Sequence, residues 1–158
     1  MRIVVISDIH GAFRNLEFAL DAQRKAQAVI FLGDGERDMD QVMPLFPQFQ
    51  YYSVRGNCDF GSVTPVEGEA VLASRRIFYT HGHLYQVKYG YSRILEEGRR
   101  RKADIVLFGH THEACAWYED GVYLMNPGSL GHPQEGGPSY GVIDITSAGI
   151  VTNLIELL

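Results

Sequence analysis

The fold is decided by the stretch Arg2-Ile3-Val4-Val5-Ile6-Ser7-Asp8-Ile9-His10-Gly11. Residues 2–7 form a mostly apolar run, and the polar side chains of Asp8 and His10 follow it in a loop that contains a glycine. A short, continuous apolar run that stops at turn residues is typical of a strand buried on both faces. We therefore expect a central strand whose carboxyl end carries chemically active side chains.

The same arrangement recurs along the chain. A helical face follows, formed by Phe13, Leu16, Ala19 and Leu20, with Asn15 as its candidate N-cap. A second buried strand over Ala28 to Leu32 ends in Gly33-Asp34-Gly35. The remaining predicted elements of this kind are a short helix over 38–46, a strand over 51–54, two strands within 67–80, a helix over about 90–102 and a strand over 104–108.

Beyond residue 112 the pattern changes from helices to hairpins. Glu119-Asp120-Gly121 is a turn signal between strands over 114–118 and 122–125, and a last strand pair over 140–145 and 149–156 turns at Ser147-Ala148-Gly149. Exposed strands of this region could pair in a homo-oligomer. With no repeats or linkers, residues 1–158 are predicted to form a single mixed α/β domain.

Composition narrows the classes of function. The 158 residues carry a formal net charge of -5, which argues against a binder of duplex nucleic acid. The one basic run, residues 99–102, is interpreted as the cationic last turn of a helix. Two cysteines are too few for a disulfide framework, no apolar run could cross a membrane, and no signal peptide precedes the first strand. We expect a cytoplasmic protein without membrane partners.

Polar residues collect after five separate predicted strands. The clusters are Asp8 with His10, Asp34, Asn57 with Asp59, His81 with His83, and His110 with His112. Because ligands bind outside the carboxyl ends of strands in α/β folds, these loops are expected to converge. Carboxylate, imidazole and amide donors without thiolate suit Mn²⁺, our first expectation, or Ni²⁺, Fe²⁺, Co²⁺ or Zn²⁺. Seven of these residues are candidate ligands, which is enough for two ions that share a carboxylate. They are Asp8, His10, Asp34, Asn57, His81, His110 and His112.

These motifs, in this order over residues 8–112, resemble the calcineurin-like metallophosphoesterase family, in particular its small prokaryotic phosphodiesterase branch. Cys58-Asp59 and Asn126-Pro127-Gly128-Ser129 are similar to features of that branch. The resemblance implies a four-layer α-β-β-α sandwich in which two mixed sheets lie between helices. It also implies that one ion is held by Asp8, His10 and His112 and the other by Asn57, His81 and His110. Asp34 would bridge the two ions.

Two positions depart from the family pattern. Many members carry a proton-donating histidine after the asparagine, where this chain has Cys58. A thiol is a poorer acid than imidazolium at neutral pH, and we interpret Cys58 as a small buried packing residue. The carboxylate that often follows the Gly-Asp pair falls off its usual spacing, at Glu36 or Asp38.

The expected activity is hydrolysis of a phosphodiester, possible because a hydroxide that bridges two divalent ions can attack phosphorus in line. Three further residues complete the predicted site. Asn57 would bind an ion and the phosphate, Asp59 would orient either a histidine or the Asn57 loop, and His83 would contact phosphate or donate a proton unless it only lines the surface. Weak proton donation predicts a preference for good leaving groups. The substrate class is a small phosphodiester or a nucleotide-like molecule.

A competing class is a scaffold for protein-protein interaction, since the retromer complex contains a subunit with this fold and a degraded site. All seven ligand positions are competent here, which favours the enzyme.

Overall fold

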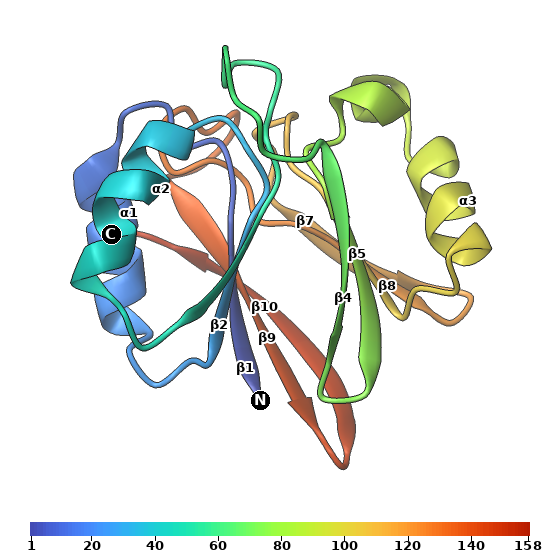
Figure 1. Cartoon of the computed structure of the whole chain (residues 1–158). Helices are drawn as coiled ribbons and strands as arrows, with labels where there is room; N and C mark the ends of the chain where they lie inside the picture. Colours follow the sequence, from blue (N-terminus) through green and yellow to red (C-terminus); the bar gives the residue numbers. More distant parts are fainter.

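Residues 1–158 of the computed structural model form two five-stranded sheets that pack face to face between helices (Figure 1). The strands are β1 (Arg2–Ile6), β2 (Ala28–Phe31), β3 (Gln50–Ser53), β4 (Glu67–Leu72), β5 (Arg75–Thr80), β6 (Ile105–Leu107), β7 (Cys115–Glu119), β8 (Val122–Asn126), β9 (Ser139–Thr146) and β10 (Gly149–Glu156). The α-helices are α1 (Phe13–Ala22), α2 (Glu36–Val42) and α3 (Ser92–Arg100). Short 3₁₀ turns cover Met43–Leu45, His83–Tyr85 and Val87–Tyr89. The predicted four-layer sandwich is confirmed.

The first sheet has the order β10-β9-β1-β2-β3. Its strands β1, β2 and β3 are parallel, with Ile3 opposite Ala28 and Ala28 opposite Gln50. Strand β9 is antiparallel to β1, and β10 is antiparallel to β9. The apolar run that opens the sequence is therefore the middle strand, with neighbours on both sides and all of Ile3–Ile6 buried.

The second sheet has the order β4-β5-β6-β8-β7, in which β5, β6 and β8 are parallel and β4 and β7 run antiparallel at the edges. Because β7 and β10 are both edge strands, pairing between two copies of the chain through the hairpin region stays a prediction.

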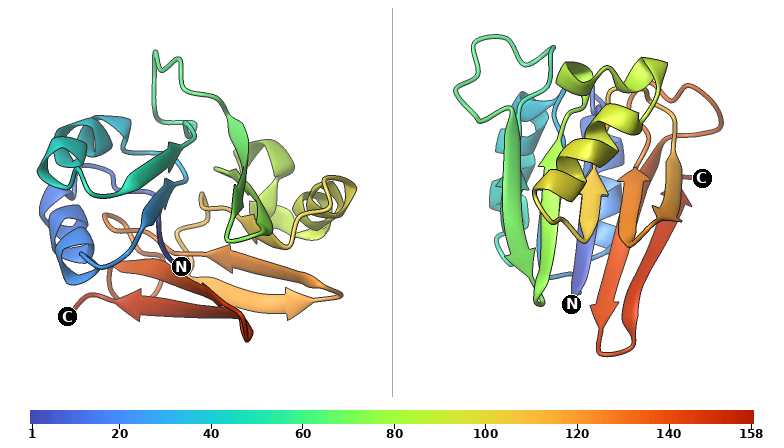
Figure 2. Two further views of the ribbon diagram at one scale, coloured as in Figure 1. Left: turned by 60° about the horizontal axis from the view of Figure 1, so that its bottom comes forward. Right: turned by 90° about the vertical axis from the view of Figure 1, so that its right-hand side faces the viewer.

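Apolar side chains form three clusters between the layers of the sandwich. Ile3 and Val5 of β1 point into the space between the sheets and join a cluster that includes Ile77 and Leu107 of the other sheet. Val4 and Ile6, on the opposite face of β1, pack in the cluster that contains residues of α1 and α2. A third cluster lies between the second sheet and α3. Figure 2 shows the helices on the outer sides of both sheets.

Two local predictions need correction. Helix α1 begins at Phe13 with Ala12 as its N-cap residue, so Asn15 lies inside the helix, where its side-chain amide donates to the Leu130 carbonyl. The helix predicted over 38–46 begins earlier, at Glu36, and its last turn is 3₁₀.

The basic run lies at the end of α3, as predicted. Within it, Arg101 pairs with Glu67 and Glu97 and covers the Phe78 ring.

The carboxyl ends of β1, β2, β3, β5 and β6 lie at the same edge of the two sheets, at the top of Figure 1. The loop between β3 and β4 projects beyond this edge. No helix has the length and apolar character needed to cross a membrane.

Candidate metal centre

Loops that are distant in the sequence bring their polar side chains together at this edge, as the sequence predicts. One group consists of Asp8, His10 and His112, whose potential ligand atoms lie within 4.8 Å of one another. Asp8 Oδ1 is 3.1 Å from His112 Nε2 and 3.6 Å from His10 Nε2, and the two imidazole nitrogens are 3.2 Å apart. Donors from β1 and β6, which belong to different sheets, therefore meet at one point.

A second group shares Asp8 and adds Asp34 and His81 within the same 4.8 Å limit. His81 Nε2 is 3.3 Å from Asp34 Oδ2 and 3.0 Å from the side-chain oxygen of Asn57. Asp34 Oδ2 also lies 3.8 Å from His10 Nε2. Asp34 thus stands between the two groups, in reach of an imidazole from each.

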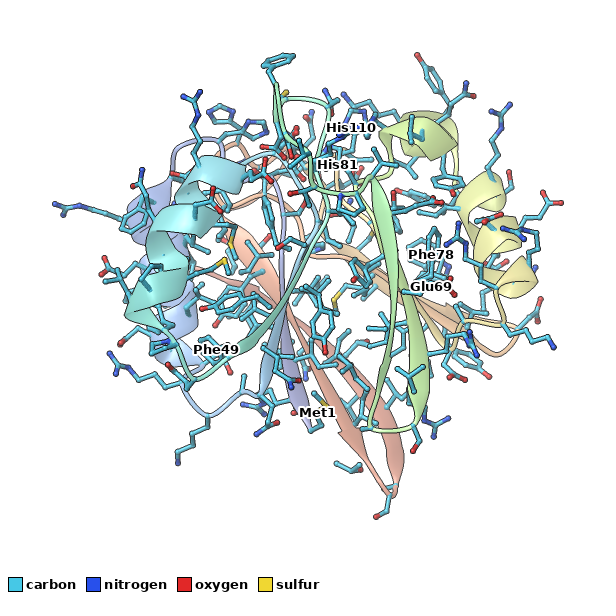
Figure 3. All side chains as sticks on the ribbon, in the orientation of Figure 1. Met1, Phe49, Glu69, Phe78, His81 and His110 are labelled. Carbon is cyan, nitrogen blue, oxygen red and sulfur yellow. The ribbon has the colours of Figure 1, made fainter.

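His110 and His83 complete the arrangement. The His110 ring lies beside that of His81, with 5.1 Å between centroids, and its backbone N–H donates to Asp8 Oδ2 (Figure 3). The His83 ring is 5.3 Å from the His81 ring and 6.0 Å from that of His110, and its Nδ1 is buried without a partner. The structure thus brings together all the predicted candidates.

Backbone carbonyls orient two of the imidazoles. Nδ1 of His81 lies 2.7 Å from the Leu32 carbonyl oxygen, and Nδ1 of His112 lies 2.7 Å from that of His132. A carbonyl only accepts, so each Nδ1 must carry a proton, and loss of the proton on Nε2 would leave a lone pair directed into the cluster. This is the tautomer that histidine ligands of metals adopt.

The backbone at the strand ends is held in an unusual conformation. Five candidate ligands have positive φ angles, namely Asp8, His10, Asp34, His110 and His112. Such angles cost energy outside glycine and gather at functional sites. Glycine is also required at positions 56 and 109, because side chains lie close to the backbone there. An added Cβ would lie 2.0 Å from Asp34 Oδ1 at Gly56 and 2.0 Å from Ser7 Oγ at Gly109.

The charges of the cluster are balanced between carboxylates and imidazoles. Burial opposes ionisation of Asp8, but the imidazoles of His10 and His112 hold its pKa well below the usual value. The Asp8 carboxylate in turn raises the pKa of His10 and of His112. Burial lowers the pKa of His110 to about 4. The carboxylates therefore stay ionised and attract positive charge.

A divalent cation fits these residues. Asp8 is fully buried, and its Oδ1 has no hydrogen-bond partner. Buried, unpartnered carboxylate oxygens are costly unless a positive charge meets them. Carboxylate, imidazole and amide donors at these separations form such a binding set.

Asp59 hydrogen-bonds backbone groups of two loops and no histidine. Its carboxylate accepts backbone N–H groups from Asp34, Gly35, Glu36 and Gly56 at 2.8–3.0 Å. It therefore ties the loop after β2 to the loop after β3, and holds Asn57 and Asp34 in place instead of orienting a histidine.

The interpretation of Cys58 as a buried packing residue is wrong, because this side chain is exposed. Partial desolvation and the neighbouring Asp34 carboxylate raise the pKa of its thiol. Its backbone N–H donates to Asp34 Oδ1 at 2.8 Å. Of the two acidic candidates nearby, Glu36 accepts a hydrogen bond from the Thr64 hydroxyl and Asp38 accepts one from the Gly11 N–H.

Two hollows lie on either side of the donor cluster. The larger, about 590 Å³, is bounded by His10 and Asp34 on the cluster side and by the exposed loop of residues 58–62. The carboxylates in its lining are those of Asp34, Glu36, Asp38, Asp40 and Asp59, and its basic residues are His10 and Arg37. The smaller, about 400 Å³, is lined by residues that include Lys88, His110, His112 and Gln134.

Sequence reasoning missed His132. Its ring stacks on that of His10, with 5.0 Å between centroids and 8° between planes. The residue has no neighbour in a His-x-His or Asp-x-His pattern, and its one available signal was its position three residues after Ser129 in the Asn-Pro-Gly-Ser turn.

The chain is similar to known phosphoesterases in sequence and in fold. Residues 1–148 match the family model described as the calcineurin-like phosphoesterase superfamily domain. Phosphodiesterase YfcE of Escherichia coli K12 is 31% identical over 169 residues, which covers 91% of this chain and 88% of YfcE. A crystal structure of a predicted phosphoesterase from Streptococcus pneumoniae TIGR4 has a TM-score of 0.85 at 30% identity, covering 98% of this chain and 88% of that one.

The chain is also similar in sequence to a vacuolar sorting protein. Vacuolar protein sorting-associated protein 29 of Schizosaccharomyces pombe is 34% identical over 107 residues, which covers 62% of this chain and 57% of that protein.

Proposed function

Because the chain belongs to the calcineurin-like phosphoesterase superfamily, we propose that it is a metal-dependent phosphodiesterase that uses two divalent cations. The observation that carries this proposal is the meeting of carboxylates and imidazoles from four strand ends with the Asn57 amide from a fifth, with Asp34 in reach of both groups of donors. The relative named a phosphodiesterase supports the same reaction class.

The proposed ligands follow the two groups. Asp8, His10 and His112 would hold one ion, and Asn57, His81 and His110 the other, with Asp34 shared. When bound, such ions, with Mn²⁺ proposed first, supply water activation and neutralise charge on a phosphoryl group. The buried ionised carboxylates would attract the ions, and Nε2 of His81 and of His112 would bind them after losing its proton.

Other residues act on the substrate. The Asn57 side chain uses its oxygen toward His81 and the cation site, and its amide nitrogen donates one proton to Cys58 Sγ at 3.6 Å, so the second amide proton would donate to a phosphate oxygen. His83 has a lowered pKa, chiefly because it is partly buried and lies near His81. A neutral His83 imidazole would position the phosphate by a hydrogen bond. The raised thiol pKa makes Cys58 a weak proton donor, and good leaving groups should therefore react faster.

The surroundings favour diesters over monoesters. A diester carries one negative charge, whereas a monoester carries about 1.5 to 2 at neutral pH. The carboxylates that line the larger hollow repel the second charge. Hollows on both sides of the donor cluster also offer space for two ester groups. A small phosphodiester is therefore the proposed substrate class.

The alternative is a catalytically weak scaffold, to which the similarity to a vacuolar sorting protein gives some support. The complete set of donors in this chain favours hydrolysis. The two functions separate in an assay, because a scaffold could bind metal without hydrolysing any ester.

Elemental analysis combined with hydrolysis of bis(4-nitrophenyl) phosphate tests the proposal. We expect purified protein saturated with Mn²⁺ to retain two equivalents of metal, to lose hydrolysis on chelation and to regain it on add-back of Mn²⁺. The monoester 4-nitrophenyl phosphate should react more slowly. Metal binding without hydrolysis would favour the scaffold, and less than one equivalent of metal would refute the metal centre.

A further inference from the structure

One loop contacts every member of the group formed by Asp8, His10 and His112. This loop, residues 129–132, is called here the clamp loop. Ser129 Oγ donates to the Asp8 carbonyl at 2.6 Å, and the His132 carbonyl accepts from His112 Nδ1 at 2.7 Å. The His132 ring stacks on the ring of His10. The three residues come from two different strand ends, yet a single segment touches all of them.

The clamp loop is held firmly. Ser129 Oγ accepts the backbone N–H groups of Gly131 and His132, at 3.2 and 2.8 Å. The buried Leu130 carries a carbonyl that accepts from the Asn15 side chain at 2.7 Å. A Cβ on Gly131 would lie 2.2 Å from the Ile9 carbonyl oxygen, so the loop lies directly against the backbone of the β1 end. His132 is thus presented from a fixed support.

His10 depends on this contact more than its neighbours do. His81 and His112 are each oriented by a carbonyl at Nδ1, but no protein group hydrogen-bonds Nδ1 of His10. The stacked ring of His132 is the contact that takes the place of such a bond. The clamp loop makes no such contact with Asp34 or with the His81 ring, which are held by the Cys58 N–H and the Leu32 carbonyl.

We propose that the clamp loop presets the Asp8, His10 and His112 group for its cation, with the His132 ring as the positioning residue for His10. The inference rests on the proposed function, because it takes this group as one of two cation sites. Groups that orient a ligand change metal affinity by about 10–100-fold when they are removed. Removing the ring should therefore weaken one of the two binding events and leave the other unchanged.

Titration of metal-stripped protein with Co²⁺, followed by visible absorption and calorimetry, tests this inference. H132A should weaken one binding event by about tenfold, and this event should be the one that H10A abolishes. H132F keeps a flat ring and should stay close to the wild type, whereas H132Q keeps polarity without a ring and should behave like H132A. Q134A is the control close to the clamp loop, since the hydrogen bond from Gln134 to the His112 carbonyl comes from its backbone N–H and would be kept.

The outcomes are distinct. If wild-type protein binds no Co²⁺, the proposed function fails, whatever the variants do. If the wild type binds two ions and H132A binds both with unchanged affinity, only the role of His132 fails. Affinity that is kept in H132Q and lost in H132F would overturn the stacking argument. Thermal melts of each stripped variant show whether the fold is intact, and H132F keeps the test decisive should H132A unfold.

Discussion

The two sheets contribute different chemistry to one site. The ends of β1, β2 and β3 carry both carboxylates and the amide, with His10 as their one imidazole, whereas the ends of β5 and β6 carry only imidazoles. Neither side is a complete binding set. The ends of β1, β2 and β3, called here the acidic wall, supply the negative charge, and the ends of β5 and β6, called the imidazole wall, supply nitrogen donors, so the proposed cations would lie where the two walls meet. The difference teaches that packing of the two sheets, and not either sheet alone, creates the site.

Neutralising the acidic wall should have the largest effect. We expect D34N to lower kcat/KM for bis(4-nitrophenyl) phosphate at least about 100-fold, because the shared carboxylate supplies several kcal/mol of charge stabilisation and 1.4 kcal/mol is about tenfold. The matched control D21N changes an exposed carboxylate of α1 and should retain wild-type activity. A D34N enzyme with more than a tenth of wild-type activity would show that the acidic wall is not required.

An imidazole added at position 58 would make the acidic wall more similar in chemistry to the imidazole wall. C58H would place a better proton donor on the exposed loop beside Asp34. We expect hydrolysis of alkyl esters, which have poor leaving groups, to rise about tenfold, below the 10²–10⁴ of an optimised general acid. Rates across aryl esters of graded leaving-group pKa provide the measurement, and the steep dependence expected for the wild type should flatten in C58H. A flat dependence already in the wild type would contradict weak donation.

Protons and metal ions compete for the imidazoles of the site, which gives a pH dependence. The raised pKa values of His10, His81 and His112 mean that protonation of these residues stabilises the folded, stripped protein below about pH 6.5, and this contribution is lost as pH rises through the raised values. Asp8, with a lowered pKa, contributes above about pH 4. We expect the increase in Tm caused by Mn²⁺ to be larger at pH 8 than at pH 6. Scanning calorimetry measures it, and an equal increase at both pH values would argue against imidazole ligands.

The smallest effect is expected for a carboxylate of the larger hollow that is not a proposed ligand. Asp40 lines the larger hollow and forms no ion pair in the structure. D40N should improve kcat/KM about two- to threefold for a diester with an extra phosphate, since exposed charges contribute below about 1 kcal/mol. The matched substrates are the 4-nitrophenyl ester of thymidine 5′-phosphate and its 3′-phosphorylated analogue. Equal changes for both substrates would show that the hollow does not sense charge.

Much of this arrangement could be predicted from the sequence. Apolar runs end close to Asp8, His81 and His110, as Ile3–Ile6 does before Asp8. The carboxyl ends of parallel strands in an α/β fold lie at one edge of the sheet. The contacts of Asp59 and His132 could not be predicted, because hydrogen bonds to backbone N–H groups and ring stacking leave no spacing in the sequence. Cys58 was misjudged for a related reason, since its type favours burial while the loop that carries it projects from the fold.

Assembly of the site has a consequence for synthesis of the protein. Strand β1 is completed on one side by β9, and the Asp8 carbonyl accepts a hydrogen bond from Ser129, so the first strand must wait until residues 129–146 have been made. At about 5–20 residues per second the ribosome needs roughly 6–30 s to reach them. During that interval the nascent chain lacks the complete donor set, and we expect capture of a metal ion only after these residues have emerged.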